Sequence, residues 1–267
     1  MMMPRMPKMR RARGYRLYDG DGRRYLDLWL DGGGALLGHR GSSAVAEMKS
    51  AISRGLVARV ASFHEARMTR ALERAFPAYR SVRLYSCRCR VLEAVSRYLG
   101  RRVEAADVHD PAIEDRKGSS ILAAYWRPYT ETAVSAEALI PILPFTIGGA
   151  PAAVCFREEL SDEDLPSDRL PGFVLAGARK AFEHLALSRS PDPCAGLLLD
   201  GSRGWIRKGP YVRAAFDPAE YPAVFSRFLS EGVVLFPGYP GPSILPAECS
   251  PGELKLLADL FARIPGG

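Results

Sequence analysis

The spacing of apolar residues predicts alternating strands and helices along most of the 267-residue chain. Apolar and polar positions alternate on both sides of an Asp-Gly-Asp-Gly turn within residues 15–31, which is typical of a β-hairpin. Apolar residues spaced three and four apart predict helices at 42–55, 64–75, 90–100, 172–187, 218–231 and 251–263. Shorter apolar runs predict strands at 81–86, 121–126, 140–145, 152–156, 197–199, 204–207, 211–216 and 232–236. Together these elements favour an α/β layered fold with a small α+β part near the carboxyl end.

A polar stretch at residues 101–120 interrupts this alternation. It contains Asp-Pro at 110–111 and Gly-Ser-Ser at 118–120, which are typical of turns and loops. We therefore expect the chain to cross the surface of the protein there.

The charge of the chain is +7, from 31 arginines and 6 lysines against 30 acidic residues. Eight of the first 24 residues are basic, so binding to nucleic acid through phosphates is one hypothesis. Base-stacking aromatic residues are not interleaved with these charges, which disfavours nucleic acid as a partner.

The composition also bears on the compartment and on metal binding. No apolar run approaches the roughly 20 residues of a membrane-spanning helix, and the amino terminus lacks the apolar core of a secretory signal, so we expect a cytoplasmic protein without membrane contact. Cysteines stand at 87, 89, 155, 194 and 249, without a CxxC pair. This pattern favours reduced thiols and predicts neither a disulfide framework nor a metal site.

Residues 12–55, ARGYRLYDGDGRRYLDLWLDGGGALLGHRGSSAVAEMKSAISRG, resemble the opening of class III aminotransferases and glutamate-1-semialdehyde aminomutases. In those enzymes a Gly-x-x-Leu-Tyr-Asp-x-Asp-Gly-x-x-Tyr-Leu-Asp hairpin leads to a Gly-rich turn and Leu-Gly-His. Later stretches keep the order of the family, at 81–95, 146–156, 221–238 and 246–260.

The resemblance implies the fold type I arrangement of pyridoxal-phosphate-dependent transferases. That fold has a large domain around a mostly parallel seven-stranded sheet and a small domain made from both chain ends. This chain is shorter than the family members, with the gap between residues 100 and 140, so we expect a truncated large-domain sheet. The predicted division is a small domain of 12–55 with 190–267, an abbreviated large domain of 56–189, and a flexible basic arm at 1–11.

The Schiff-base lysine of the family does not appear at its expected position. In the family it directly precedes a Gly-rich turn, which here is TIGGAP at 146–151 with Gly148 and Gly149. The preceding residue is Phe145, which cannot form an imine. No lysine occurs between Lys117 and Lys180.

The phosphate loop of the family, Ser-Gly-Thr at a helix start, is replaced here by Cys87, Arg88 and Cys89. An arginine in place of the glycine would hinder close approach of the backbone to an anion. One interpretation is that Arg88 binds an anion itself. We favour the other, in which Arg88 fills the vacated cofactor space or faces solvent. A metal or redox role for the cysteine pair is the less favoured alternative.

We interpret the chain as a non-catalytic pseudoenzyme that acts by association. The expected partners are a second copy of the chain or a true aminotransferase, and the ancestral cofactor, pyridoxal phosphate (PLP), is not expected. Two alternatives stay open: a residual PLP-dependent aminotransferase or aminomutase using an unexpected lysine, and a basic nucleic-acid-binding protein.

Overall fold

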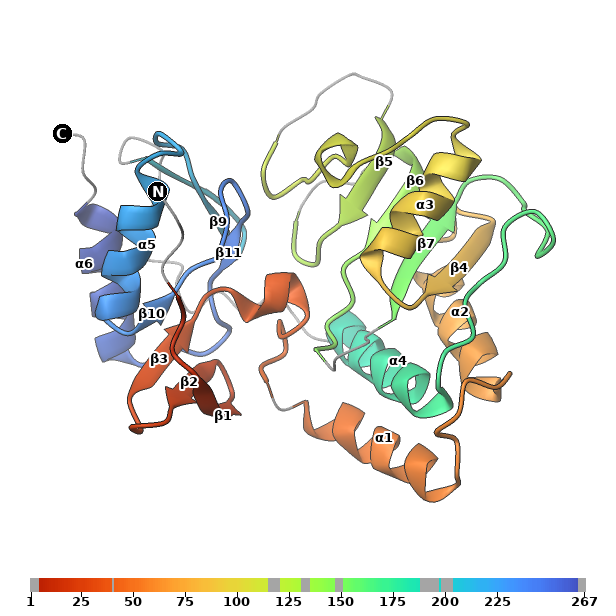
Figure 1. Ribbon diagram of the computed structural model, residues 1–267, viewed down its shortest axis with the longest axis horizontal. Helices are drawn as coiled ribbons and strands as arrows, with labels where there is room; N and C mark the ends of the chain where they lie inside the picture. The colour runs from red at the N-terminus through yellow and green to blue at the C-terminus, as the bar shows by residue number, and fades with distance from the viewer. Residues whose placement is uncertain are drawn as a thin grey trace. The chain divides into compact units, whose positions relative to one another are not determined.

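A computed structural model of the chain describes residues 5–39, 41–114, 121–130, 135–146, 151–187, 197 and 204–263. The chain divides into two compact units, Met1–Arg40 with Arg189–Gly267 and Gly41–Ser188 (Figure 1). The predicted division had assigned residues 41–55 to the domain of the chain ends. Helix α1 (Ser42–Ser53) instead packs against helix α4 (Gly172–Leu187) of the second unit.

The first unit contains a four-stranded sheet in the order β1-β2-β3-β10. The predicted hairpin is confirmed, because β2 (Arg16–Asp19) and β3 (Arg24–Asp27) pair antiparallel. Strand β10 (Val233–Val234) lies parallel to β3. Strand β1 (Met9–Arg13) pairs with β2, so the prediction of a flexible arm is wrong for residues 9–11, whose backbone joins the sheet.

A second sheet of this unit has the order β11-β9-β8. Strands β8 (Trp205–Lys208) and β9 (Tyr211–Ala214) form an antiparallel pair that β11 (Ser243–Ile244) extends. Helices α5 (Tyr221–Ser230) and α6 (Pro251–Ala262) supply aromatic rings to the core around Trp205. Its ring centroid lies 5.8 Å from that of Phe228 and 5.0 Å from that of Phe261.

The Gly-rich stretch after β3 forms a short 3₁₀ turn, Leu30–Gly33. Gly32 and Gly33 have φ angles of 64° and 115°, in the region that residues with a Cβ rarely adopt. Leu30 and Asp31 just before them also have positive φ angles, so the glycines ease only the second half of this turn.

The second unit is built on a four-stranded sheet in the order β4-β7-β6-β5. Strand β7 (Ala152–Phe156) runs antiparallel to both neighbours, β4 (Ser81–Tyr85) and β6 (Ala136–Pro141), whereas β5 (Ile121–Trp126) is parallel to β6. Strand β6 was predicted at 140–145. It instead spans Ala136–Pro141, and the N–H of Ile142 just beyond it still donates to Trp126 O at 3.0 Å.

Helices cover both faces of this sheet. Helices α2 (Phe63–Ala75) and α4 pack on one face through residues such as Met68, Leu72 and Phe182. Helix α3 (Arg88–Tyr98) packs on the other face through Val91 and Val95. The result is a three-layer α/β unit. Across the described residues, no helix has both the length and the apolar character needed to span a membrane.

The segment after α3 differs from the prediction of a surface crossing. It passes through a short 3₁₀ turn at Ala105–Asp107 and then enters the interior, where His109 forms a parallel bridge with Ala124 of β5. The carboxylate of Asp110 is buried and accepts hydrogen bonds of 2.6 Å from both Nε and Nη2 of Arg127. Because this pair neutralises the charge of Asp110, a polar stretch can lie inside the protein.

Candidate functional site

The end of β4 and the start of α3 carry Cys87, Arg88 and Cys89, the residues predicted to replace the family's phosphate loop. After β4 the chain passes through Ser86 and Cys87 and enters α3 at Arg88. Cys87 is the N-cap residue and its side chain makes no capping hydrogen bond. The first amides of α3 therefore lack a side-chain acceptor, and the helix dipole gives this end a positive potential.

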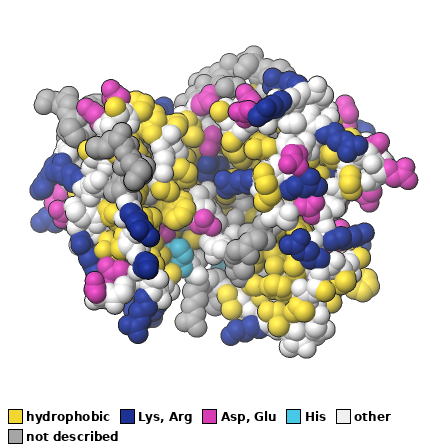
Figure 2. All heavy atoms as spheres, in the orientation of Figure 1, with side chains coloured by type: hydrophobic (Ala, Val, Ile, Leu, Met, Phe, Trp, Pro, Cys, Tyr) yellow, Lys and Arg dark blue, Asp and Glu magenta, His cyan; other side chains and the backbone are white. Residues whose placement is uncertain are grey.

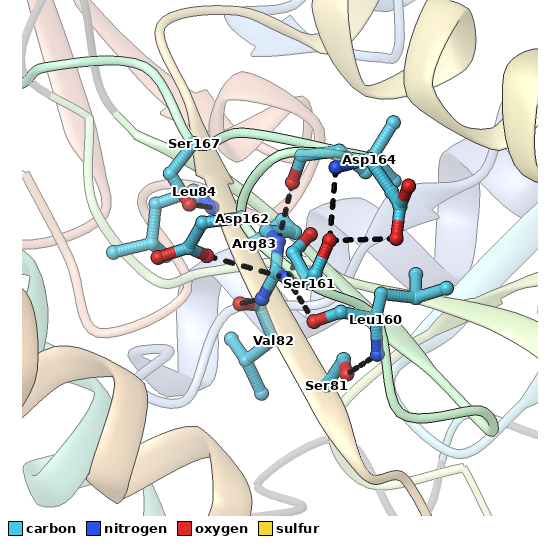
Figure 3. A network of polar contacts seen from close by, with 10 residues as sticks. Ser81, Val82, Arg83, Leu84, Leu160, Ser161, Asp162, Asp164 and Ser167 are labelled. Atoms are coloured by element: carbon cyan, nitrogen blue, oxygen red, sulfur yellow. Dashed lines mark hydrogen bonds and ion pairs between the residues drawn. The ribbon is translucent and has the colours of Figure 1, made fainter.

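A buried arginine holds the loop after β7 against β4 (Figure 3). The guanidinium of Arg83 donates to the carbonyl oxygens of Leu160 and Leu165 at 2.6 and 2.5 Å. A buried guanidinium needs such acceptors because its desolvation is otherwise costly. The loop is fixed from the other side as well, since Leu160 N–H donates to Ser81 Oγ at 2.7 Å.

This loop brings Asp168 to the start of α3. The Asp168 amide donates to Leu84 O at 2.8 Å, and the carboxylate accepts from the amide and hydroxyl of Ser86 at 3.0 and 2.8 Å. Arg90 Nη2 donates to the other carboxylate oxygen at 3.2 Å. Burial alone would raise the pKa of Asp168, but the hydrogen bonds from Ser86 and Arg90 outweigh it and lower that pKa. An internal anion thus lies beside the amino terminus of α3.

The two cysteines of the loop are joined to each other. A disulfide links Cys87 and Cys89, whose Cα atoms are 5.5 Å apart. The expectation of reduced thiols is therefore wrong for this pair. Sequence spacing did not predict the bond, because a Cys-x-Cys pair can close only when the backbone turns, and here the turn is the entry into α3. Cys155 is a buried free thiol.

Arg88 is exposed, so of the alternatives open for it the structure favours a solvent-facing side chain. Its guanidinium carbon lies 6.0 Å from the centroid of the Tyr125 ring, and that of Arg127 lies at the same distance from the ring. Burial raises the pKa of Tyr125, which keeps its phenol neutral near pH 7. Because Asp110 neutralises Arg127, Arg88 supplies the net positive charge beside this neutral aromatic ring.

Phe145, at the position expected for the lysine, is buried between two helices. A Cβ placed on Gly177 of α4 would lie 2.7 Å from Phe145 Cε2 and 2.5 Å from Met48 Cγ, so both side chains cover this glycine. Within the described residues, no hydrogen bond or ring contact joins Phe145 to the 87–89 loop. Gly148, Gly149 and Lys117 lie outside the described residues.

Sequence reasoning missed Asp168, Ser86 and Arg83 as parts of this site. The hydrogen bonds between Ser86 and Asp168 join residues 82 positions apart. The only local signal is a polar turn, Pro-Ser-Asp at 166–168, which does not show that Asp168 contacts Ser86.

Comparison with known proteins supports the fold rather than a specific activity. No protein-family model matches the chain. An uncharacterised protein from Treponema pallidum is 27% identical, in an alignment that covers 91% of this chain and 90% of that protein.

Solved structures that resemble this one are aminotransferases and an aminomutase. A glutamate-1-semialdehyde aminomutase from Pseudomonas aeruginosa has a TM-score of 0.68 at 14% identity, covering 95% of this chain and 86% of its own. An ornithine delta-aminotransferase from Plasmodium falciparum has a TM-score of 0.67 at 13% identity, covering 96% and 92%. A transaminase with PLP bound has a TM-score of 0.64 at 13% identity, covering 97% and 90%. The fold of this chain is therefore that of the PLP-dependent class III aminotransferases and aminomutases, as the resemblance predicted.

The same comparison corrects one expectation. No cofactor was expected for this chain, but a similar solved structure holds PLP, so the fold points to PLP rather than to the lack of a cofactor.

The residues fit the two ends of PLP unequally. At the phosphate end, the uncapped start of α3 and the exposed Arg88 offer positive charge to a phosphate, although the Asp168 carboxylate, held beside this helix start by Ser86 and Arg90, reduces it. At the aldehyde end, the residue predicted at the lysine position is Phe145, which has no amine and is packed against Gly177. The arrangement suits a ligand held by its phosphate and does not supply an imine at position 145.

Proposed function

We propose that this chain is a class III aminotransferase-like protein of the cytoplasm that has lost Schiff-base chemistry and acts by association. The partner is a second copy of the chain or a complete aminotransferase. Phe145 supports the loss of chemistry, because the residue predicted to replace the lysine is a buried ring without an amine. If the chain does retain an activity, the structural neighbours make it that of a transaminase or aminomutase.

One observation carries the proposal of association. Six large hydrophobic side chains are exposed among the described residues, and five of them belong to one stretch of the second unit. They are Val45, Ile52, Val57, Val60 and Phe63, with Phe63 87% exposed, and we call them the apolar strip. Hydrophobic side chains gather on the surface over α1 (Figure 2). An exposed group of this kind marks an interaction surface in a soluble protein.

The apolar strip has the hydrophobic composition that is typical of the centre of a protein–protein interface. Val45 and Ile52 lie seven residues apart on α1 and so share one face of the helix, while Met48 and Ala51 point into the unit. Burial of Phe63 and its neighbours would supply the apolar centre of an interface, and the rim would have to come from surrounding residues.

We further propose that PLP binds without a covalent bond. The amides of the first turn of α3 and the guanidinium of Arg88 would hold its phosphate. PLP would supply an aldehyde and an electron sink when bound, and no residue at position 145 can engage that aldehyde. The cofactor would then act as a structural ligand of the second unit.

Association is tested by sedimentation velocity at micromolar concentration. We expect the parent chain to dimerise, or to remain monomeric and co-sediment with an added class III aminotransferase. The double variant Val57→Ser with Phe63→Ser should lose either complex, with an unchanged circular dichroism spectrum.

The matched control is Tyr239→Ser, because Tyr239 is the sixth exposed hydrophobic residue and belongs to the other unit. This variant should associate like the parent. A parent chain that stays monomeric and binds no aminotransferase would overturn the proposal, as would equal loss of association in the strip and control variants.

A further inference from the structure

Helices α2 and α4 line a solvent-open hollow of about 270 Å³ on the second unit. The two helices lie side by side (Figure 1). The hollow is lined by Arg67, Arg70, Ala71 and Arg74 of α2 and by Arg179 and Glu183 of α4. Four guanidinium groups and one carboxylate give the lining a formal charge of +3. We call this feature the arginine hollow.

Three of these arginines carry uncompensated charge. Arg67, Arg70 and Arg74 follow the i, i+3, i+7 spacing that puts side chains on one face of a helix. All three are exposed, and none has a hydrogen bond or an ion pair with another described residue. Like charges one turn apart repel each other, so this arrangement disfavours the free protein unless an anion binds.

The fourth arginine is held in place from two sides. Arg179 pairs with Glu47 of α1 at 3.2 Å and with Glu183 one turn further along α4. Its side chain is only 16% exposed, and its Nε is buried without a hydrogen-bond partner in the described part of the chain. A buried N–H without an acceptor costs free energy that a bound anion would recover. The carboxylates of Glu47 and Glu183 are engaged by Arg179 and do not neutralise the arginines of α2.

The size and lining of the hollow indicate its ligand. A volume of about 270 Å³ is at the small end of ligand pockets, which suits a metabolite rather than a macromolecule. Arg67 and Arg74 are seven residues apart, which corresponds to about 10.5 Å along the helix axis. A ligand that contacts both needs anionic groups at two places. No aromatic side chain lines the hollow for base stacking, which disfavours single-stranded nucleic acid.

We propose that the arginine hollow is a binding site for a small molecule that carries two or more phosphate groups. Guanidinium groups bind phosphate oxygens through paired N–H donors, and Arg179, already fixed by two carboxylates, loses little conformational freedom on binding. The hollow lies on α2 and α4, whereas the proposed PLP phosphate contacts lie at the start of α3. The two sites therefore use different residues.

The test is isothermal titration calorimetry of the full chain with inorganic tripolyphosphate, in buffer of fixed ionic strength. We expect saturable binding with one site per chain. The variant Arg70→Gln with Arg74→Gln should weaken that binding at least tenfold, and its melting temperature should be unchanged or higher because the repulsion is removed.

The matched control is Arg97→Gln with Arg101→Gln, which removes the same charge from exposed positions outside the hollow. Its affinity for tripolyphosphate should stay within twofold of the parent, as should that of Arg88→Ala. Absence of saturable binding, or an equal loss in the hollow and control variants, would overturn the proposal. The proposal would also be overturned if single-stranded RNA bound more tightly than tripolyphosphate and both double variants weakened that binding equally. That result would indicate nonspecific electrostatic binding over the protein surface.

Discussion

Arg16 and Glu253 join the two ends of the chain within the first unit. Nε and Nη2 of Arg16, on β2, donate to the two carboxylate oxygens of Glu253, on α6, at 2.8 and 2.6 Å across 237 residues of sequence. Glu253 also closes a capping box with Ser250 at the start of α6. A single carboxylate therefore fixes both a helix start and the packing of that helix against the amino-terminal sheet.

The first prediction concerns the pH dependence of the first unit. The hydrogen bond from Arg16 is the main reason why the pKa of Glu253 falls from 4.5 to about 2. Because the folded-state pKa is lowered, the stabilisation is complete above about pH 4.5 and is lost as the pH falls toward 2. Glu253→Gln should cost roughly 2–3 kcal/mol at pH 7 and much less at pH 2, measured by urea unfolding.

Glu231→Gln is the control for this prediction, because Glu231 is exposed and its side chain makes no ion pair with a described residue. Its effect should stay within about 0.5 kcal/mol at both pH values. A loss of stability in Glu253→Gln that does not change with pH would contradict the role assigned to the ion pair.

The second prediction concerns the buried pair of the second unit. Asp110→Ala leaves the guanidinium of Arg127 buried without its carboxylate, so the free energy of unfolding should fall by roughly 3–5 kcal/mol. Glu93→Gln breaks an exposed pair with Arg90 and should cost less than about 1 kcal/mol. Guanidinium chloride unfolding of both variants compares them directly. Similar losses would mean that Asp110 is not buried as described.

The third prediction tests the packing around Phe145. Gly177→Ala puts a Cβ within 2.7 Å of the Phe145 ring and 2.5 Å of Met48, so it should destabilise the second unit by roughly 1–3 kcal/mol despite the higher helix propensity of alanine. Gly252→Ala in α6 meets no atom within 4 Å and should be neutral or slightly stabilising. Thermal unfolding of the two variants measures the difference, and equal melting temperatures would show that Phe145 does not pack on Gly177.

The fourth prediction concerns the aldehyde of PLP. After incubation with PLP and borohydride reduction, peptide mass analysis should find no stoichiometric pyridoxyl-lysine, because Phe145 has no amine. A complete aminotransferase treated in parallel should be labelled at its lysine. Equilibrium dialysis of PLP without reduction should still detect binding, which Arg88→Ala weakens. A stoichiometric label on Lys117 or Lys180 would contradict the prediction and favour an enzyme with an unexpected lysine.

The local elements were largely predictable. The Asp-Gly-Asp-Gly turn with alternating flanks specifies the β2–β3 hairpin, because hairpin turns depend on a few residues. The apolar spacing of 172–187 specifies α4, since one face of the helix must be buried. Strand β6 was placed four residues too late, because the apolar run at 140–145 does not show that pairing with β5 begins at Ala136.

The sequence by itself determined the composition and the order of the elements. It also determined that residue 145 is phenylalanine, which has no amine to form an imine. Only the tertiary structure decided which distant polar groups meet. Asp168 reaches Ser86 because Arg83 fixes the intervening loop, and Asp110 is buried because Arg127 neutralises it. The physical reason is that periodicity records which side of an element is buried, whereas an ion pair depends on two side chains whose meeting is set by the path of the whole chain.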